Sequence, residues 1–259
     1  MGKSTRIVIK IGTGVLTRKD GIRLDEPAFV DLARAIATLA KDGWQVIVVS
    51  SGAVGAGLME FGRTERPTAT AELQAFASIG QARLMQTWRT HLQVRDLAGA
   101  QLLLTYEDLE SPDRRERILL TLGHLLGMGN VIPIINENDS VAVEELRFGD
   151  NDALSARVAA MVGADCLLLL TSVHGLTDAA GKLIGVVPDV ADAMGHVRAE
   201  KGALSVGGMQ TKLQATADAV AAGVPVIIAN GKEASRIPGI IAGTDACCTR
   251  FPLPSHAHV

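Results

Sequence analysis

The sequence predicts an α/β fold, a three-layer αβα sandwich in which helices cover both faces of a mostly parallel central sheet. Two patterns support this fold class. Short segments rich in Val, Ile and Leu alternate along the 259-residue chain with longer segments of helical periodicity. The short segments are also apolar without interruption, as strands are when both faces of a parallel sheet are covered.

Six segments carry the strand pattern. The first, RIVIKI, is dominated by β-branched residues, which favour extended backbone. The fifth, DCLLLL, is apolar after its first residue and reads as a fully buried strand. The predicted strands are Arg6–Ile11, Gln45–Val49, Ala98–Leu104, Val131–Ile135, Asp165–Leu170 and Val224–Ala229.

Five longer segments between these strands have apolar residues at helical spacing. The first is preceded by Asp25 and Pro27, a capping residue followed by the proline that helix starts favour. The predicted helices are Phe29–Lys41, Ala71–His91, Arg114–Leu126, Ala153–Val162 and Met209–Ala222. The least regular region, Thr177–Pro188, suggests a surface hairpin or a lobe boundary. The tail after Thr249 contains two prolines and is predicted to be poorly ordered.

Composition and charge exclude several functional classes. The net charge is −3 and aromatic residues make up 3% of the chain, so neither general attraction to nucleic acid nor base stacking is expected. Three cysteines, two of them adjacent, disfavour a disulfide framework and favour a reducing compartment. The apolar runs are too short to cross a bilayer, there is no signal-peptide pattern, and the six histidines show no zinc spacing. We therefore expect a cytoplasmic protein with no membrane partner and no protein metal site.

Small and polar residues follow several of the predicted strands. Ligands of open α/β sheets bind beyond the carboxyl ends of the strands, so these residues are the first candidates for a site. They are Gly12-Thr13-Gly14, Ser50-Ser51-Gly52, Asn136–Asp139 and Thr171-Ser172. Glycine at a strand-to-helix turn lets a phosphate approach backbone N–H groups. Turn geometry alone explains any one such glycine, but their recurrence favours a phosphate site.

Two common nucleotide-binding motifs do not fit. Gly2-Lys3-Ser4 resembles the end of a P-loop, but no strand precedes it. The glycine-rich run from Gly52 to Gly57 has the wrong spacing for a dinucleotide fingerprint. A P-loop enzyme and a dinucleotide-dependent dehydrogenase are therefore both disfavoured.

Two lysines are candidates for binding an anion. Lys10 lies between branched apolar residues inside a predicted strand, where an ammonium group needs a partner or an anion. The alternative is a lysine that reaches solvent from the strand end. Lys212 follows Gly207-Gly208-Met209 by one helical turn, so its amine can lean towards a phosphate near those glycines. The alternative is a lysine on the solvent face of the helix.

The segment NENDSVAVEELRFGDND, residues 136–152, gathers amide and carboxylate side chains beside two core segments. Helix capping explains one or two of Asp150, Asn151 and Asp152, and a polar turn is the plain explanation for Asn136 to Asp139. The alternative is a pocket for a zwitterion, in which Asp accepts from an ammonium group and Asn donates to a carboxylate.

Six ordered segments together resemble the glutamate 5-kinases of the amino-acid kinase superfamily. They are VIKIGTGVL, VSSGAVGAG, VIPIINENDSVA, FGDNDALSA, LLLLTS..GL and GGMQTKLQA, and the resemblance runs from about Arg6 to Thr244. INEND followed by GDND is specific to that family, whereas the lysine and glycine motifs are shared more widely. The resemblance implies the amino-acid kinase fold over a single domain, 1–259, with a glutamate-binding lobe, 1–164, and a nucleotide-binding lobe, 165–259.

The resemblance also implies an activity, ATP-dependent phosphorylation of the γ-carboxylate of L-glutamate, the first step of proline biosynthesis. It implies catalytic roles for Lys10, Lys212 and Asp152, with Asp152 organising the two lysines. The implied glutamate-binding residues are Ser51, Asp139, Asn151, Asn136 and Asp150. The implied nucleotide-binding residues are Lys10, Gly12, Thr171, Ser172, Val206, Gly207, Gly208, Met209, Gln210, Thr211 and Lys212. ATP, Mg²⁺, feedback inhibition by proline and a homodimer or homotetramer are further implied expectations.

The chain departs from the family pattern at two positions on the nucleotide side. Ser172 stands where the family usually has Asp, and Thr177 where it often has Tyr. Many bacterial members also carry a C-terminal domain resembling RNA-modification modules, which a short form or a shortened chain would lack. Alternatives are another superfamily kinase, acting on acetylglutamate, uridylate or isopentenyl phosphate, and a non-catalytic nucleotide-binding relative.

Overall fold

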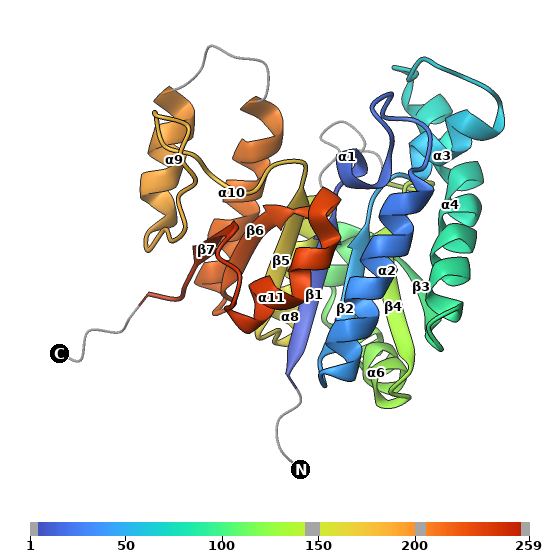
Figure 1. Cartoon of the computed structure of the whole chain (residues 1–259). Helices are drawn as coiled ribbons and strands as arrows, with labels where there is room; N and C mark the ends of the chain where they lie inside the picture. The colour runs from blue at the N-terminus through green and yellow to red at the C-terminus, as the bar shows by residue number, and fades with distance from the viewer. Residues whose placement is uncertain (1–4, 143–150, 200–205, 255–259) are drawn as a thin grey trace.

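One seven-stranded sheet organises the molecule (Figure 1). The computed structural model describes residues 5–142, 151–199 and 206–254. The strand order is β3-β4-β2-β1-β5-β6-β7, and every pair is parallel except β6 with β7. The strands are β1 (Arg6–Ile11), β2 (Gln45–Ser50), β3 (Ala98–Leu104), β4 (Val131–Glu137), β5 (Cys166–Thr171), β6 (Val226–Asn230) and β7 (Cys248–Phe251).

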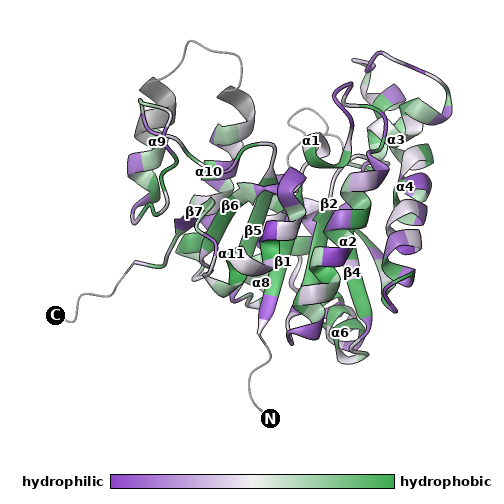
Figure 2. Cartoon of the chain, viewed as in Figure 1, coloured by the Kyte–Doolittle hydropathy of each residue, from purple (hydrophilic) through white to green (hydrophobic). Residues whose placement is uncertain are grey.

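Helices cover both faces of this sheet, which confirms the predicted α/β sandwich. Successive residues of the central strands enter opposite cores: Ile7 and Ile9 pack on one side, Val8 on the other. Both sides are therefore apolar, and Figure 2 shows the strand interior in the hydrophobic colour. The larger helices are α2 (Glu26–Lys41), α3 (Ala53–Glu60), α4 (Thr70–Gln93), α6 (Pro112–Gly127), α8 (Asn151–Val162), α9 (Val190–Ala199) and α10 (Val206–Ala221). Shorter ones are α1 (Thr13–Leu16), α5 (Tyr106–Glu110), η1 (Gly231–Arg236) and α11 (Ile237–Ala242).

The sheet edge at the C-terminus corrects one expectation. The chain after Thr249 was predicted to be poorly ordered, but Arg250 and Phe251 belong to β7, which pairs antiparallel with β6. Phe251 is 1% exposed and packs in the core with α10. The segment is too short to show the alternation that identifies longer strands, so its pairing with β6 was not visible in the sequence.

The start of α2 differs from its predicted cap. Asp25 occupies the N-cap position, but its side chain makes no capping hydrogen bond. Its carboxylate instead pairs with Lys232 of η1 at 3.0 Å. A predicted feature that does appear is the surface hairpin, where Thr177 and Leu183 form an antiparallel bridge.

Helices α3 and α4 pack backbone to backbone. A Cβ added to Gly57 would lie 1.9 Å from the carbonyl oxygen of Phe76, and one added to Gly80 would lie 1.8 Å from that of Ala53. Such distances exclude any side chain at either glycine, so both must stay glycine for the helices to approach. This contact fixes the first turn of α3, directly after β2, against the middle of α4.

The single sheet runs through both predicted lobes, with β1 to β4 in residues 1–164 and β5 to β7 in residues 165–259. The assignment of one substrate to each lobe stays a prediction. Within the described part of the chain, no helix has the length and apolar character needed to span a membrane.

Candidate active site

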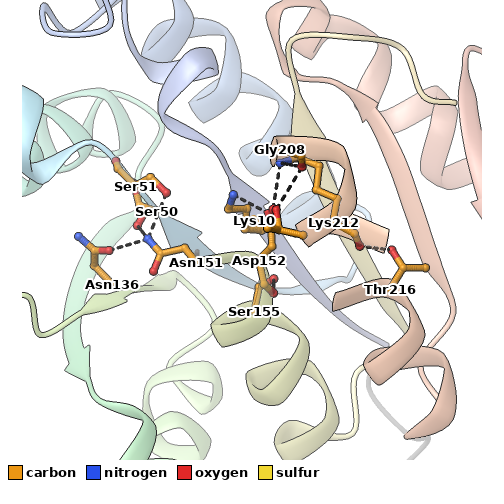
Figure 3. A network of polar contacts seen from close by, with 11 residues as sticks. Lys10, Ser50, Ser51, Asn136, Asn151, Asp152, Ser155, Gly208, Lys212 and Thr216 are labelled. Atoms are coloured by element: carbon orange, nitrogen blue, oxygen red, sulfur yellow. Dashed lines mark hydrogen bonds and ion pairs between the residues drawn. The ribbon is translucent and has the colours of Figure 1, made fainter. Parts of the chain in front are cut away.

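The carboxyl ends of β1, β2, β4 and β5 lie at one edge of the sheet, where the start of α8 also arrives. Figure 3 shows the polar side chains that meet there. They fall into two groups: a lysine–aspartate cluster between β1, α8 and α10, and an amide cluster between β2, β4 and α8.

The lysine–aspartate cluster is built around Asp152, in the first turn of α8. Lys10 Nζ lies 2.5 Å from Asp152 Oδ1, and Lys212 Nζ lies 2.9 Å from Oδ2. All three residues are buried, with exposed fractions of 4% for Lys10, 1% for Asp152 and 9% for Lys212. Neither alternative from the sequence holds, because Lys10 does not reach out to solvent and Lys212 does not face it.

The electrostatics of Asp152 follow from this geometry. Burial alone would raise the pKa of its carboxyl group, but the charges of Lys10 and Lys212 outweigh burial, so the pKa is lowered. The carboxylate is therefore ionised near neutral pH. Within these three residues, two ammonium groups share the one negative charge of Asp152.

The start of α10 contributes to the same cluster. Val206 and Gly207 begin the helix, and the carbonyl oxygen of Gly208 accepts from Lys212 Nζ at 3.1 Å. Thr211 Oγ1 donates to Asp152 Oδ2 at 3.3 Å. The side chain of Lys212 thus folds back along its own helix towards the N-terminus, as long helical side chains do.

Two glycines, Gly12 and Gly208, lie close to the lysines of the cluster in the chain. A Cβ at Gly12 would lie 3.5 Å from the carbonyl oxygen of Leu170 and 3.6 Å from Lys10 Nζ, and one at Gly208 would meet nothing within 4 Å. Neither glycine is forced by packing. Gly12 therefore places backbone without a side chain beside the ammonium group of Lys10.

The amide cluster is centred on Asn151, next to Asp152 in the chain. Its Nδ2 donates to the carbonyl oxygen of Ser50 at 2.8 Å and to Asn136 Oδ1 at 2.9 Å, and Ser51 Oγ lies 3.1 Å from the same nitrogen. Its own carbonyl oxygen, Oδ1, is buried and has no hydrogen-bond partner among the residues that the structure describes. The zwitterion pocket considered from the sequence uses Asn as a donor to a carboxylate, whereas the donor of Asn151 is directed to protein groups.

A cavity opens beside the amide cluster. It is lined by Thr13, Ser51, Gly52, Ala53, Val54, Gly55, Arg66, Asn136, Glu137, Asp139 and Asn151. Glu137 and Asp139 give it negative charge, and Arg66, from the loop between α3 and α4, adds a cation. Gly52 turns into α3 with a φ of 104°, a left-handed conformation that favours glycine. The first backbone amides of α3 therefore lie at the cavity wall.

The predicted site residues are distributed as follows. The structure brings Lys10, Asp152 and Lys212 together, and it places Ser51, Asn136, Asp139 and Asn151 at one cavity. Thr171 ends β5, Ser172 is exposed beyond it, and Met209 and Gln210 lie in the first turns of α10. Asp150 lies outside the described residues.

Four residues near this site received no individual role from the sequence. Thr13, Arg66 and Glu137 line the cavity, and Gln81 of α4 binds the amide of Asn136. Thr13 and Glu137 stand inside strand-end segments that did draw attention. Arg66 and Gln81 lie far from any strand end, and only the fold brings them there.

Comparison with known proteins identifies the relatives of this chain. The amino acid kinase family profile matches residues 5–230. The glutamate 5-kinase of Synechococcus sp. (strain JA-2-3B'a(2-13)) is 44% identical over 259 residues, which cover 97% of this chain and 69% of that relative. The glutamate 5-kinase of Symbiobacterium thermophilum is 44% identical over 246 residues, 93% of either chain.

Solved structures support the fold. The carbamate kinase of Giardia lamblia bound to AMP-PNP matches with a TM-score of 0.67 at 17% identity, over 97% of this chain and 99% of that one. The UMP kinase of Ureaplasma parvum matches with a TM-score of 0.60 at 14% identity, over 96% and 100%. The profile match shows that the chain belongs to the amino acid kinase family, and the relatives that are 44% identical to it show that, within this family, it belongs to the glutamate 5-kinases.

Proposed function

We propose that the protein catalyses the ATP-dependent phosphorylation of the γ-carboxylate of L-glutamate, giving L-glutamyl 5-phosphate for proline biosynthesis. The observation that carries this reaction is the position of the Lys10–Asp152–Lys212 cluster. It lies directly beside the amide cluster, because Asn151 and Asp152 are consecutive residues of α8. A phosphoryl-binding group and an amino-acid-binding group therefore share one edge of the sheet.

The cavity has a complementary group for each end of glutamate. Asp139 and Glu137 supply negative charge for the α-ammonium group. Arg66, the Ser51 hydroxyl and the amides at the start of α3 are donors for the α-carboxylate. The γ-carboxylate then extends towards Lys10 and Gly12.

The chemistry requires no general base. A γ-carboxyl group has a pKa of about 4.3, so it is ionised near pH 7 and can attack directly. One of its oxygens forms a bond to the γ-phosphorus of ATP, the bond from that phosphorus to the bridging oxygen breaks, and ADP leaves. Because both reactants are anions, the main demand on the protein is to offset their repulsion. Lys10 and Lys212 supply two ammonium groups at that point, and Asp152 holds them apart on opposite oxygens.

The nucleotide binds on the side of β5 and α10. The proposed contacts are the backbone at Gly12, the strand end at Thr171 and Ser172, and the first two turns of α10, from Val206 to Lys212. A helix start presents free N–H groups and the positive end of the helix dipole, both suited to phosphate oxygens. Ser172 cannot replace the negative charge of the usual Asp, so we expect the nucleotide contacts there to be neutral hydrogen bonds.

Magnesium is expected on the nucleotide and not in a protein cage. The described residues contain no group of three or more His, Cys, Asp or Glu side chains suited to a metal ion. The Asp152 carboxylate is occupied on both oxygens by lysines. The residues present therefore fit an ion held mainly by phosphate oxygens and water, where it would neutralise phosphate charge.

The free amine distinguishes glutamate from the acceptors of related kinases. An acetylated amine has no charge for Asp139 and Glu137 to bind, and it is bulkier. A coupled assay of ADP release with glutamate, N-acetylglutamate, uridylate and isopentenyl phosphate tests this directly. Glutamate-dependent ADP release that exceeds the other acceptors is expected. ATP binding without glutamate-dependent turnover would indicate a non-catalytic relative.

Regulation and assembly follow as proposals from the same family assignment. Proline is a smaller zwitterion that fits the ammonium and carboxylate ligands of the cavity, so we propose that it competes with glutamate. A homodimer or homotetramer and a cytoplasmic location are proposed on the same basis. Adding proline to the glutamate assay, and measuring mass in solution by light scattering, test the first two.

A further inference from the structure

A second cluster of chemically reactive side chains lies at the carboxyl ends of β5 and β6, apart from the cavity and the lysine–aspartate cluster. Cys247 directly precedes β7, His174 follows β5, and Glu233 belongs to η1, which follows β6. Cys247 Sγ lies 3.2 Å from His174 Nδ1, and His174 Nε2 lies 3.4 Å from Glu233 Oε1. A thiol, an imidazole and a carboxylate therefore stand in a row, the order in which a nucleophile, its base and an orienting group are arranged.

Backbone pairing explains why these three side chains meet. Ala229, near the end of β6, pairs with Cys248, the residue after Cys247. The chain after β5 is bound to the same strand, because the backbone N–H of Leu176 donates to Thr249 Oγ1 at 2.8 Å. The segments that carry the thiol, the imidazole and the carboxylate are therefore held together by the sheet and by the contacts of β7.

Arg236 supports both ends of the row. Its Nη1 lies 3.3 Å from Glu233 Oε2, the oxygen that does not face His174. It also binds both carboxylate oxygens of Asp245, at 2.8 and 2.9 Å. Asp245 Oδ1 in turn accepts from the backbone N–H of Cys247 at 2.9 Å. Arg236 therefore links the segment that carries the carboxylate to the segment that carries the thiol.

The position of Glu233 sets the role of the imidazole. A carboxylate oxygen beside His174 Nε2 favours the ring proton on that nitrogen, since a carboxylate can only accept. Nδ1 is then the acceptor that faces the thiol of Cys247. His174 can therefore act as a general base when the sulfur attacks an electrophile.

The three cysteines differ in their surroundings. Cys247 is half-buried, and the row borders solvent, because the side chains of His174 and Glu233 are 42% and 39% exposed. Cys166 and Cys248 are buried. Burial raises the pKa of the Cys166 thiol to about 12 and also raises the pKa of the Cys248 thiol. Both of these thiols are therefore protonated and shielded near neutral pH, so a reagent in solution should distinguish Cys247 from them.

We propose that Cys247 is a site of reversible covalent modification by small disulfides, with His174 as the general base and Glu233 as the residue that orients the imidazole. His174 Nδ1 takes the thiol proton while Cys247 Sγ forms a bond to one sulfur of the disulfide. The original sulfur–sulfur bond breaks, and the other half leaves as a thiolate that takes up the proton. Cys247 is thereby oxidised to a mixed disulfide, and the leaving half is reduced to a thiol. None of these residues belongs to the proposed kinase site, so the modification does not depend on the proposed function.

Dithiodipyridine is a suitable probe, because each exchange releases a pyridinethione that is followed by its absorbance. In the folded protein the reaction should stop at a single adduct, and peptide mass mapping should place this adduct on Cys247. Cys247→Ser should abolish the reaction until urea exposes Cys166 and Cys248. His174→Phe keeps a ring but has no basic nitrogen, so the rate constant should fall about tenfold or more.

Further variants separate the base from its surroundings. His174→Gln lacks a basic nitrogen but keeps a polar surface side chain, and a similar fall is expected. His124→Phe, at an exposed histidine of α6, should leave the rate constant unchanged. Continued protection of Cys166 and Cys248 from the probe reports that each variant is folded. A folded protein in which Cys247 does not react or another cysteine reacts first, or an unchanged rate constant in both His174 variants, would overturn the proposal.

The orienting role of Glu233 has its own test. Glu233→Ala should lower the rate constant, because nothing then favours the proton on His174 Nε2. Glu233→Gln keeps an oxygen that can accept from Nε2, so it should restore most of the rate. A rate constant in Glu233→Ala equal to that of the unmodified protein would remove Glu233 from the mechanism.

Discussion

Lys10 of β1 and Lys212 of α10 bind opposite oxygens of one buried carboxylate, that of Asp152, at 2.5 and 2.9 Å. The arrangement ties the first strand, the start of α8 and the start of α10 to one point. It also places two positive charges within reach of a single site, beside the one negative charge of Asp152. An anionic ligand at this point would add negative charge beside the two ammonium groups. The Asp152 carboxylate stabilises both ammonium groups in the absence of such a ligand.

Replacing either lysine by Met should lower kcat by about 10²–10³-fold, since each ammonium group stabilises charge on the transferred phosphoryl group. Methionine keeps most of the apolar stem, so the fold should persist. Steady-state ADP release at saturating glutamate and ATP measures the effect. Lys41→Met, at the exposed end of α2, is the matched control and should have unchanged kcat. Near-normal turnover in both Lys10→Met and Lys212→Met would remove the catalytic role from this cluster.

Asp152→Asn should destabilise the protein by about 3–5 kcal/mol, because it leaves two buried ammonium groups without their counter-charge. The effect should also depend on pH. The pKa of Asp152 is lowered by folding, so the ionised carboxylate stabilises the folded state above its unfolded pKa, about 3.9. That stabilisation is lost as the pH falls through the lower, folded pKa.

Urea unfolding at a series of pH values measures both effects. The unmodified protein should lose stability on acidification below about pH 4, and Asp152→Asn should lose less over the same interval. Asp31→Asn, at a half-buried residue of α2 whose side chain is 47% exposed, is a suitable control. Identical pH dependence in Asp152→Asn and the unmodified protein would contradict the assigned electrostatics.

Much of this architecture was predictable because its signals are local. The strands β1 and β3 begin and end at the residues predicted from their apolar segments. Lys10 is a candidate from the sequence because a lysine inside such a segment needs a partner. The short strand β7 and the helix α9 carried no comparable signal. The partners of the Asn151 amide could not be predicted for a related reason. Its nitrogen is held by Ser50 and Asn136, and no pattern in one segment reveals what a distant segment will offer.

Gly12→Ala should separate catalysis from stability. The backbone φ at Gly12 is −74°, which any residue adopts, and an added Cβ would make only ordinary contacts with Leu170 and Lys10. We therefore expect a melting temperature within a few degrees of the unmodified protein. The same Cβ lies 3.6 Å from Lys10 Nζ, in the space proposed for the phosphoryl group. The expected result is a fall of about tenfold or more in kcat/KM for ATP. Full activity would place the phosphate elsewhere.

Arg66→Ala tests which group binds the α-carboxylate of glutamate. Arg66 lines the cavity with Glu137 and Asp139, so its charge lies where an amino acid must place a carboxylate near its amine. Comparing glutamate with 4-aminobutyrate, which keeps the amine and the reacting carboxylate but lacks the α-carboxylate, isolates this contact. The substitution should reduce kcat/KM for glutamate about tenfold or more and change that for 4-aminobutyrate little. Arg63→Ala, in the same loop but with its guanidinium 5.8 Å from the Phe76 ring centre, provides the control. An equal loss for both substrates would mean that Arg66 shapes the loop and does not bind the carboxylate. An unchanged glutamate preference would assign that role to Ser51 and the first amides of α3.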